Sequence, residues 1–574
     1  MLRIFRRLKV YKWFVLGSFL FIFIQAMTDL FLPTLMGDIV DNGVVKGDVA
    51  YIWRIGSIML GIAAVGICAS ITASYCSSKA AMGLGRDLRR NVFTHVENFS
   101  LEEFDEIGTA SLITRNTNDI TQIQQVTIMV LRMVVMAPLM FAGGLIMAVS
   151  KDAKLSLVIL AITPFLAGGI LLILKKGVPL FRMVQKKLDA LNLAMRENLT
   201  GIRVIRAFNK EDYEKKRLRK ANGELTDVSI RVNKLMAFMM PLMMLIMNLT
   251  TVLIIWFGGI RIESGGMQIG DLMAFIQYVM QIMFALIMAS MMFIVIPRAS
   301  VSAKRINEVL DLQPGVKDSG TEKASEEHGT LEFEHVSFSY PGAEAPVISD
   351  ISFRAEPGEV TAIIGGTGSG KTTLVQLIPR FFDVTSGAVR VNGRNVKDYE
   401  QGALRSMIGY VPQKALLFSG TVADNIRYGK EGATIEEVQH AAEVAQASGF
   451  VEEMEQGYET HIDQGGKNVS GGQKQRLSIA RAIVRKPDLY IFDDSFSALD
   501  YKTDAKLRQS LKDETKEAAV LIVAQRVNTV QHADQIIVLD KGKIAGIGTH
   551  EQLLENNGVY QEIVKSQNGE EGIA

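Results

Sequence analysis

Six apolar stretches occupy the first half of the chain, and each is long enough to cross a lipid bilayer. They lie at 13–36, 52–78, 127–149, 153–174, 236–261 and 271–296. A bilayer core needs about 20 apolar residues per helix. Backbone groups in lipid must be paired within their own segment, so these stretches are predicted to be transmembrane helices. The first stretch is too long for a cleavable signal peptide, and no small-residue cleavage site follows it.

The distribution of lysine and arginine predicts the side on which each connecting segment lies. Segments 1–12, 79–126 and 175–235 hold 5, 5 and 16 of these residues, and the three other connections, 37–51, 150–152 and 261–271, hold one each. Because basic segments stay on the cytoplasmic side, we expect a multi-pass protein of the cytoplasmic membrane with both termini in the cytosol.

The two long inner segments carry many charges and a helical pattern rather than the Pro/Gly-rich composition of disorder. The simplest interpretation is that the membrane helices continue into the cytosol as two hairpins, with tips near Phe99–Glu106 and Ala207–Glu214. The alternative is a pair of solvated charged helices without a partner.

A polar linker at 311–329 is predicted to separate a membrane domain, 1–310, from a second domain, 330–574. In the second domain strand-like runs such as VTAIIGG, DLYIFDD and AVLIVAQ alternate with helical ones, which is typical of an α/β nucleotide-binding fold. The net charge is only +1, so no basic field indicates nucleic acid as a partner. The six apolar runs also exclude a soluble ATPase that acts on nucleic acid.

A phosphate-binding loop follows the strand VTAII and opens the helix TTLVQLI. Its residues are Gly365, Gly366, Thr367, Gly368, Ser369, Gly370, Lys371 and Thr372, and Thr373 is added to the predicted nucleotide-binding set. Glycines let backbone N–H groups face phosphate oxygens, and the helix N-terminus favours anions. Lys371 would reach the β- and γ-phosphates of ATP, and the Thr372 hydroxyl would hold Mg²⁺. The alternative is a chance Gly-rich turn.

An apolar strand, Leu489–Phe492, ends in Asp493. A carboxylate at the end of such a strand can meet Mg²⁺ through water, as a Walker B aspartate does. Many strands end in Asp, and the hypothesis gains force from the position of Asp493 about 120 residues after the phosphate loop.

The segment VSGGQ precedes a helix rich in Gln, Arg and Ala, and here the chain resembles the ATP-binding cassette exporter family. The family signature LSGGQ is matched at four of five positions, with Val469 for Leu, by Ser470, Gly471, Gly472 and Gln473. The resemblance covers the whole chain. It implies a six-helix α transmembrane bundle with long cytosolic helical extensions, followed by an α/β P-loop nucleotide-binding domain, and an ATPase coupled to transport.

The resemblance also implies roles for single residues. In the family two cassettes face head to tail, and each ATP lies between one phosphate loop and the signature of the other chain. Tyr340 resembles the aromatic residue that stacks on adenine, although a strand-end Tyr alone is more often core. Gln413 resembles the residue that senses Mg²⁺ and the γ-phosphate, and Asp500 the residue that touches the partner cassette.

Two positions depart from the family pattern. Asp494 stands where the family has the Glu that orients and polarises the attacking water, and Gln525 stands where it has a switch His. Asp retracts the carboxylate by roughly 1 Å, which can cost on the order of 100-fold in rate. Gln cannot become a cation near neutral pH. The pair resembles the degenerate half of heterodimeric exporters, so we expect a partner half-transporter with Glu and His; the alternative is a homodimer that works with Asp and Gln.

The cargo is poorly specified by the sequence. The fifth and sixth apolar stretches are rich in methionine, whose flexible thioether suits a small amphipathic cargo, drug or lipid, but also packing against membrane lipids or other helices. Asp29 could bind a cationic drug or lie at the outer interface near Pro33, and the second is favoured. A lipid or peptide exporter and a non-transporting ATP-gated regulatory or channel subunit stay open. The chain ends at Ala574, so no fused second half is expected.

Overall fold

The computed structural model describes residues 1–318 and 320–568. Its description omits the side chains of residues 170, 173, 174, 240, 290, 291, 293 and 294. By its contacts the chain divides into two units. The first comprises Met1–Glu97 and Thr109–Leu312, and the second comprises Asn98–Gly108 and Gln313–Ala574. The predicted boundaries at 310 and 329 remain a prediction, and the assignment of a short internal segment to the second unit was not anticipated.

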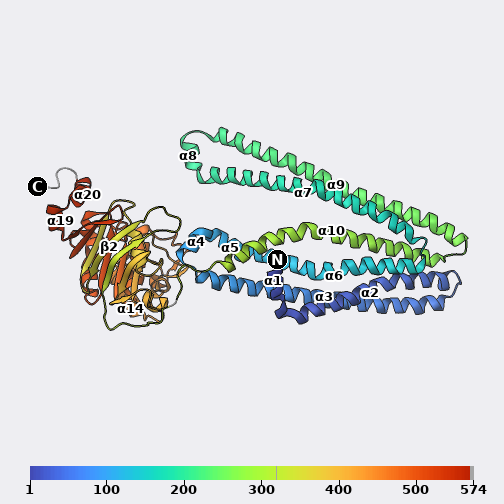
Figure 1. Ribbon diagram of the computed structural model, residues 1–574, viewed down its shortest axis with the longest axis horizontal. Helices are drawn as coiled ribbons and strands as arrows, with labels where there is room; N and C mark the ends of the chain where they lie inside the picture. The colour runs from blue at the N-terminus through green and yellow to red at the C-terminus, as the bar shows by residue number, and fades with distance from the viewer. Residues whose placement is uncertain (319, 569–574) are drawn as a thin grey trace. The chain divides into compact units, whose positions relative to one another are not determined.

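The first unit is entirely helical (Figure 1). Its elements are α1 (Leu2–Arg6), η1 (Arg7–Tyr11), α2 (Lys12–Asp38), η2 (Ile39–Val44), α3 (Val49–Glu97), α5 (Thr109–Thr114), η3 (Arg115–Asp119), α6 (Ile120–Lys151), α7 (Ser156–Thr200), α8 (Ile202–Ala207), α9 (Glu211–Glu263) and α10 (Ile269–Asp311).

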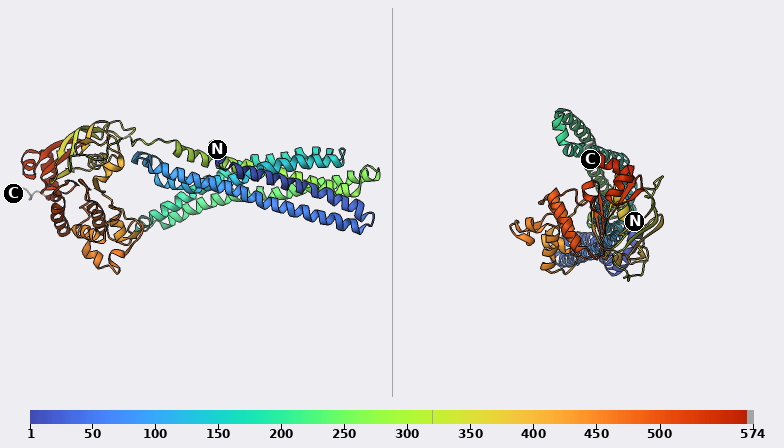
Figure 2. Two further views of the ribbon diagram at one scale, coloured as in Figure 1. Left: turned by 90° about the horizontal axis from the view of Figure 1, so that it is seen from below. Right: turned by 90° about the vertical axis from the view of Figure 1, so that its left-hand side faces the viewer.

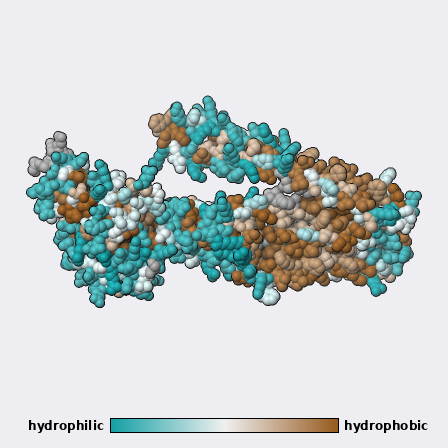
Figure 3. Space-filling view, viewed as in Figure 1, coloured by the Kyte–Doolittle hydropathy of each residue, from teal (hydrophilic) through white to brown (hydrophobic). Residues whose placement is uncertain are grey.

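Five of the six predicted membrane stretches fall within one long helix of this unit, and the sixth, 153–174, starts three residues before α7. Five helical segments of the described chain are long and apolar enough to cross a membrane: Leu2–Val44, Val49–Glu97, Thr109–Lys151, Glu211–Glu263 and Ile269–Ala289. The apolar described part of α7, Ser156–Gly169, is shorter. A belt of apolar side chains covers these helices in Figure 3, with polar side chains toward their ends.

The three connections with few basic residues meet at one end of the helices. The α6–α7 connection is tied to the α9–α10 connection, which is tied in turn to η2. The contacts are Lys151 Nζ to Asp271 Oδ1 at 2.7 Å, Arg261 Nε to Asp152 Oδ2 at 2.8 Å, and the Gly270 amide donating to Asp41 Oδ1 at 2.7 Å. This clustering at one end is the arrangement that the alternating charge pattern requires of the outer connections.

The helices extend well beyond the apolar stretches as two hairpins. The first turns through α4 (Leu101–Ile107), close to the predicted tip. The second turns at α8, between Thr200 and Glu211, so it starts before the predicted Ala207. Helices α7 and α9 lie side by side in Figures 1 and 2, and in Figure 1 they separate from the other helices toward α8.

Helix α4 belongs to the second unit through contacts with the segment that follows α10. Its N-terminus is closed by a capping box, in which Glu103 accepts from the Ser100 amide at 2.6 Å. The other Glu103 oxygen accepts from the Gly315 amide at 2.9 Å, and Glu103 is buried. The tip of the first hairpin is therefore hydrogen-bonded to the segment that leads from α10 to β1.

The second unit contains three sheets. A four-stranded sheet has the order β2 (Ile348–Ala355), β1 (Leu331–Phe338), β4 (Ser386–Val391) and β5 (Arg394–Asn395), and all of its neighbours are antiparallel. A six-stranded sheet has the order β12 (Lys543–Gly548), β11 (Gln535–Asp540), β3 (Val360–Gly365), β10 (Ala519–Ala524), β9 (Leu489–Asp493) and β6 (Ile408–Val411). The third is a short pair, β7 (Gly420–Thr421) and β8 (His461–Ile462).

Helices pack around these sheets in the second unit. They are α11 (Lys371–Leu377), α12 (Gln401–Ser406), α13 (Val422–Arg427), α14 (Ile435–Val444), α15 (Ser448–Glu452), η4 (Gly457–Glu459), α16 (Gly471–Ile483), α17 (Tyr501–Glu514), α18 (Val527–Val530), α19 (His550–Asn556) and α20 (Gly558–Asn568).

Five strands of the larger sheet run parallel, and only β12 is antiparallel to its neighbour. Parallel strands are buried on both faces, and every residue of β9 and β10 is buried. Because parallel strands end at one edge, the loops after β3, β10, β9 and β6 come together there. The sequence signals at those four loops therefore meet in space.

Candidate nucleotide site

The loop between β3 and α11 turns on two glycines. Gly368 has φ +81° and Gly370 has φ +95°, both in the left-handed region that L side chains rarely adopt. Gly370 is the N-cap of α11, and the helix begins at Lys371. The free N–H groups of the first helical turn and of the loop are thus available to phosphate oxygens.

Lys371 is anchored over this loop. Its Nζ donates to the carbonyl oxygens of Gly365 at 2.9 Å and Gly366 at 2.8 Å, and the residue is buried. Burial lowers the pKa of Lys371, while the nearby carboxylates of Asp494 and Asp493 act in the opposite direction. The amine is therefore a desolvated donor within the field of two carboxylates, where a phosphate would find little competition from water.

Asp493 ends β9 and is almost fully buried, at 1% exposure. Its Oδ1 accepts from the Thr372 hydroxyl at 3.3 Å and its Oδ2 from the Tyr410 hydroxyl at 3.4 Å. Burial raises the pKa of Asp493 and also that of Tyr410. A hydroxyl and a carboxylate side by side are the hard oxygen ligands that Mg²⁺ prefers, so the residues present fit the predicted metal.

Asp494 has φ +49°, an uncommon conformation for a residue other than glycine. Its side chain lies between two amides: Gln413 Nε2 and Gln525 Nε2 donate to the same oxygen, Oδ2, at 3.1 and 3.2 Å. The Asp494 amide donates to the Val523 carbonyl at 2.9 Å and fixes the turn against β10. One carboxylate oxygen thus joins the loops that follow β6, β9 and β10.

The predicted residues at this edge of the sheet share one pocket of about 280 Å³. It is lined by Val347, Thr367, Gly368, Gly370, Lys371, Thr372, Thr373, Gln413, Asp493, Asp494, Val523 and Gln525. Of the predicted phosphate-loop residues, Gly365, Gly366 and Ser369 are in contact with Lys371 rather than in the lining. The pocket thus gathers cationic, hydroxyl, amide and carboxylate groups around one cavity.

Tyr340 lies beside the pocket rather than in its lining. Its hydroxyl is 3.1 Å from Thr373 Oγ1, and its ring packs edge-on against Phe338 and Phe382. Tyr340 therefore lies beside the first turn of α11. Its ring also has a share in the core of the antiparallel sheet, and the adenine role remains a prediction.

The signature residues lie outside this pocket. Ser470 is the N-cap of α16 and forms a capping box with Gln473, whose Oε1 accepts from the Ser470 amide at 2.8 Å. Ser470 and Gly471 are exposed. Asp500 is exposed and caps α17 by accepting from the Thr503 amide at 2.9 Å, which holds its pKa below the usual range. These residues thus lie at the exposed, capped N-termini of α16 and α17, and their predicted role toward a second chain remains a prediction.

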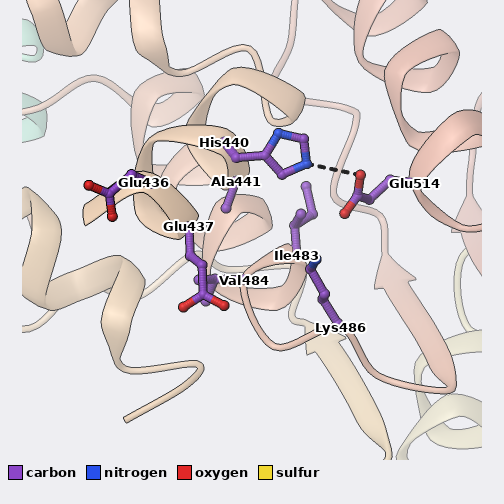
Figure 4. A pocket seen from close by; sticks show the side chains of 8 residues that line it. All are labelled: Glu436, Glu437, His440, Ala441, Ile483, Val484, Lys486 and Glu514. Carbon is purple, nitrogen blue, oxygen red and sulfur yellow. Dashed lines mark hydrogen bonds and ion pairs between the residues drawn. The ribbon is translucent and has the colours of Figure 1, made fainter. Parts of the chain in front are cut away.

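A second pocket of the cassette, about 240 Å³, contains none of the predicted site residues (Figure 4). It lies between α14, α16 and α17, where His440 Nε2 and Glu514 Oε2 are 3.0 Å apart. Glu437 pairs with Lys430 at 2.5 Å. Nowhere in the described chain do three His, Cys, Asp or Glu residues gather as a metal site.

Two contributors to the candidate site were not predicted from the sequence. Tyr410 donates to the second oxygen of Asp493, and Val347, just before β2, lines the pocket. Tyr410 lies three residues before Gln413, so its proximity to Asp493 follows once β6 is placed beside β9. No sequence pattern marks Val347 as a pocket residue, because its position depends on how the two sheets pack.

Comparisons with known proteins place both units. Family models match at residues 15–286, described as ABC transporter transmembrane region, and at 348–497, described as ABC transporter. A curated relative, an uncharacterized ABC transporter ATP-binding protein of Mycobacterium tuberculosis, is 45% identical over 549 residues, which cover 95% of this chain and 94% of the relative. An ATP-dependent lipid A-core flippase of Desulfotalea psychrophila is 32% identical over 537 residues, 93% of each chain.

A solved structure shares the fold. The structure of a bacterial Atm1-family ABC exporter with ATP bound has a TM-score of 0.81 to this chain at 23% identity, and the match covers 98% of this chain and 99% of that one. At this identity the match shows a shared fold and nothing further.

The buried carboxylate of Asp493 leads to a stability prediction for protein free of nucleotide and metal. Because the pKa of Asp493 is raised in the folded state, its charged carboxylate lowers the stability of the fold at pH values above that pKa. This loss of stability disappears as the pH falls below the unfolded-state pKa of about 3.9. Asp493→Asn should therefore raise the melting temperature at pH 7, and the gain should shrink on acidification. Thermal unfolding in EDTA from pH 7 to 4 measures this. A variant that is less stable than wild type at pH 7 would contradict it.

Proposed function

Because the chain belongs to the ABC transporter family and couples ATP hydrolysis to transport, we propose that it is one half of an exporter that moves an amphipathic small molecule, drug-like or lipid, out across the cytoplasmic membrane. The observation that carries this proposal is the presence, in one chain, of apolar helices able to cross a bilayer and a pocket equipped for a nucleoside triphosphate. The relative described as a lipid A-core flippase keeps lipids within the proposed cargo class.

The proposed orientation places the cassette and both termini in the cytosol. The clustering of the three Lys/Arg-poor connections at one end of the helices supports it. The positive-inside rule then puts the opposite end, with the basic hairpins, on the cytoplasmic side. ATP would reach its pocket from the cytosol and cargo would leave at the other face.

In the proposed pocket the phosphate loop and Lys371 would hold the triphosphate, and Thr372 and Asp493 would hold Mg²⁺. The metal would neutralise phosphate charge. Gln413 and Asp494 would orient the attacking water, and Gln525 would offer a neutral hydrogen bond in place of a cation. The exposed Ser470 and Gly471 serve the ATP of the partner cassette.

A dimer would also cover apolar side chains that this chain exposes. A cassette groove of about 370 Å³ is rimmed by Leu416, Phe418 and Tyr428, and all three are exposed. The tip of the second hairpin exposes Val204 and Phe208, at 61% and 71%, and Figure 3 shows an apolar patch there. We infer that this tip docks in the groove of a partner cassette and, with the α4 tip, passes cassette motion to the membrane helices.

We propose that the partner is a different chain with Glu and His at the matching positions. Asp494 and Gln525 support this, because the Asp494 carboxylate is both short and occupied by two amide donors on one oxygen. Such a carboxylate is a weak acceptor for the proton of attacking water. ATP bound at this pocket would be hydrolysed slowly. ATP bound at the partner's pocket, which this chain's VSGGQ completes, would be hydrolysed fast.

A transport assay tests the proposed function. Inside-out vesicles that contain this chain with a second half-transporter should accumulate a fluorescent amphipathic dye above the external concentration when ATP is added. Lys371→Ala should reduce this accumulation several-fold because the β- and γ-phosphates lose their buried amine. Equilibration of the dye without accumulation would indicate an ATP-gated channel and would contradict the proposed pump.

The turnover of the purified chain alone tests the slow pocket. The double variant Asp494→Glu with Gln525→His should hydrolyse ATP at least about 10-fold faster than wild type, because it extends the carboxylate by the roughly 1 Å that matters for water positioning. The same double variant with Lys371→Ala is the control and should lose the gain. A wild-type rate equal to that of the double variant would favour a homodimer that works with Asp and Gln.

A further inference from the structure

The membrane helices of the first unit enclose a pocket of about 390 Å³. It lies between α2, α6 and α10 and is lined by Asp29, Leu32, Pro33, Met136, Ala137, Met140, Gln277, Gln281, Phe284, Ala285 and Met288. Most of this lining is apolar, and its thioethers and aromatic ring adapt to ligands of different shape. The polar side chains are one carboxylate and two amides.

The carboxylate of Asp29 has no basic partner in the described part of the chain. Gln281 donates to the Asp29 backbone carbonyl at 2.9 Å. Its own Oε1 is buried without a hydrogen-bond partner. A carboxylate and an unsatisfied amide oxygen leave this pocket with an excess of hydrogen-bond acceptors and with negative charge.

Helical rise places the pocket well away from the outer ends of α2 and α10. The Gly270–Asp41 hydrogen bond marks the outer end of α10 and α2. Asp29 is 12 positions from Asp41, and Gln281 is 11 positions from Gly270. At about 1.5 Å per residue both lie roughly 16–18 Å from that end, close to the middle of a hydrocarbon core about 30 Å thick. This is deeper than the outer-interface position near Pro33 that the sequence favoured for Asp29.

We propose that this pocket is a binding site for amphipathic organic cations and that Asp29 selects for their positive charge. A carboxylate is costly at this depth and is retained where it lines a cavity or pairs with a charge. A bulky cation supplies that charge while its apolar groups contact Met136, Met288 and Phe284, and the Phe284 ring can add a cation–π contact. The proposal rests on the export function above and narrows its cargo from amphipathic molecules in general to cations.

Binding of tetraphenylphosphonium to the purified full chain in nanodiscs, without ATP, tests the site. Asp29→Asn keeps the shape of the side chain and removes its charge, so it should weaken tetraphenylphosphonium binding about tenfold or more. It should not weaken binding of tetraphenylborate, an anion of the same shape. Asp29→Glu should restore cation binding, and Asp38→Asn, at the end of the same helix, should leave it unchanged.

Phe284→Ala guards against misfolding of the Asp29 variant, because Phe284 is 63% exposed and its removal should spare the fold. It should weaken tetraphenylphosphonium about threefold, as expected for loss of a cation–π contact. Unchanged cation binding in both variants would overturn the proposal. Vesicles separate this result from the export function. Unchanged tetraphenylphosphonium binding in both variants together with intact ATP-driven transport of a neutral dye refutes the cation site alone, and Asp29-dependent binding without ATP-driven accumulation refutes the pump alone.

Discussion

Parallel strand pairing is the constraint on which the cassette depends. Strands β3, β10, β9 and β6 run in one direction and are hydrogen-bonded in that order. Four loops that are far apart in the sequence therefore end at one edge. The phosphate loop, Gln525, Asp493–Asp494 and Gln413 form a single pocket for this reason, and any change of strand order would scatter them. Carboxyl ends of strands are the usual place for ligands in open α/β sheets.

At that edge, Asp494 connects the loops that follow β6, β9 and β10. Its Oδ2 accepts from the residues that follow β6 and β10, and its backbone pairs with β10. A longer Glu could extend past these amides toward water, whereas the short Asp is held by them. The same three hydrogen bonds that give the pocket its order thus explain, in our proposal, why it would hydrolyse ATP slowly and would rely on a partner for fast turnover.

Much of this architecture could be predicted because its signals are local. Apolar length and backbone pairing in lipid predict one long helix for each membrane stretch, and the Gly-rich loop lies between β3 and α11, where the sequence predicted it. The contacts that depend on packing between distant segments were not predictable. The Tyr410–Asp493 contact needs β6 beside β9, and the two amides on one Asp494 oxygen need three loops at once.

The identity of the nucleotide held at the Asp494 pocket tests the central claim most directly. The purified chain is loaded with radiolabelled ATP and Mg²⁺, separated rapidly from free nucleotide, and incubated for several minutes, and the retained label is resolved by chromatography. A slow pocket predicts that the retained nucleotide is still mostly ATP, in wild type but not in Asp494→Glu with Gln525→His. Retained label that is already ADP in wild type would contradict the account.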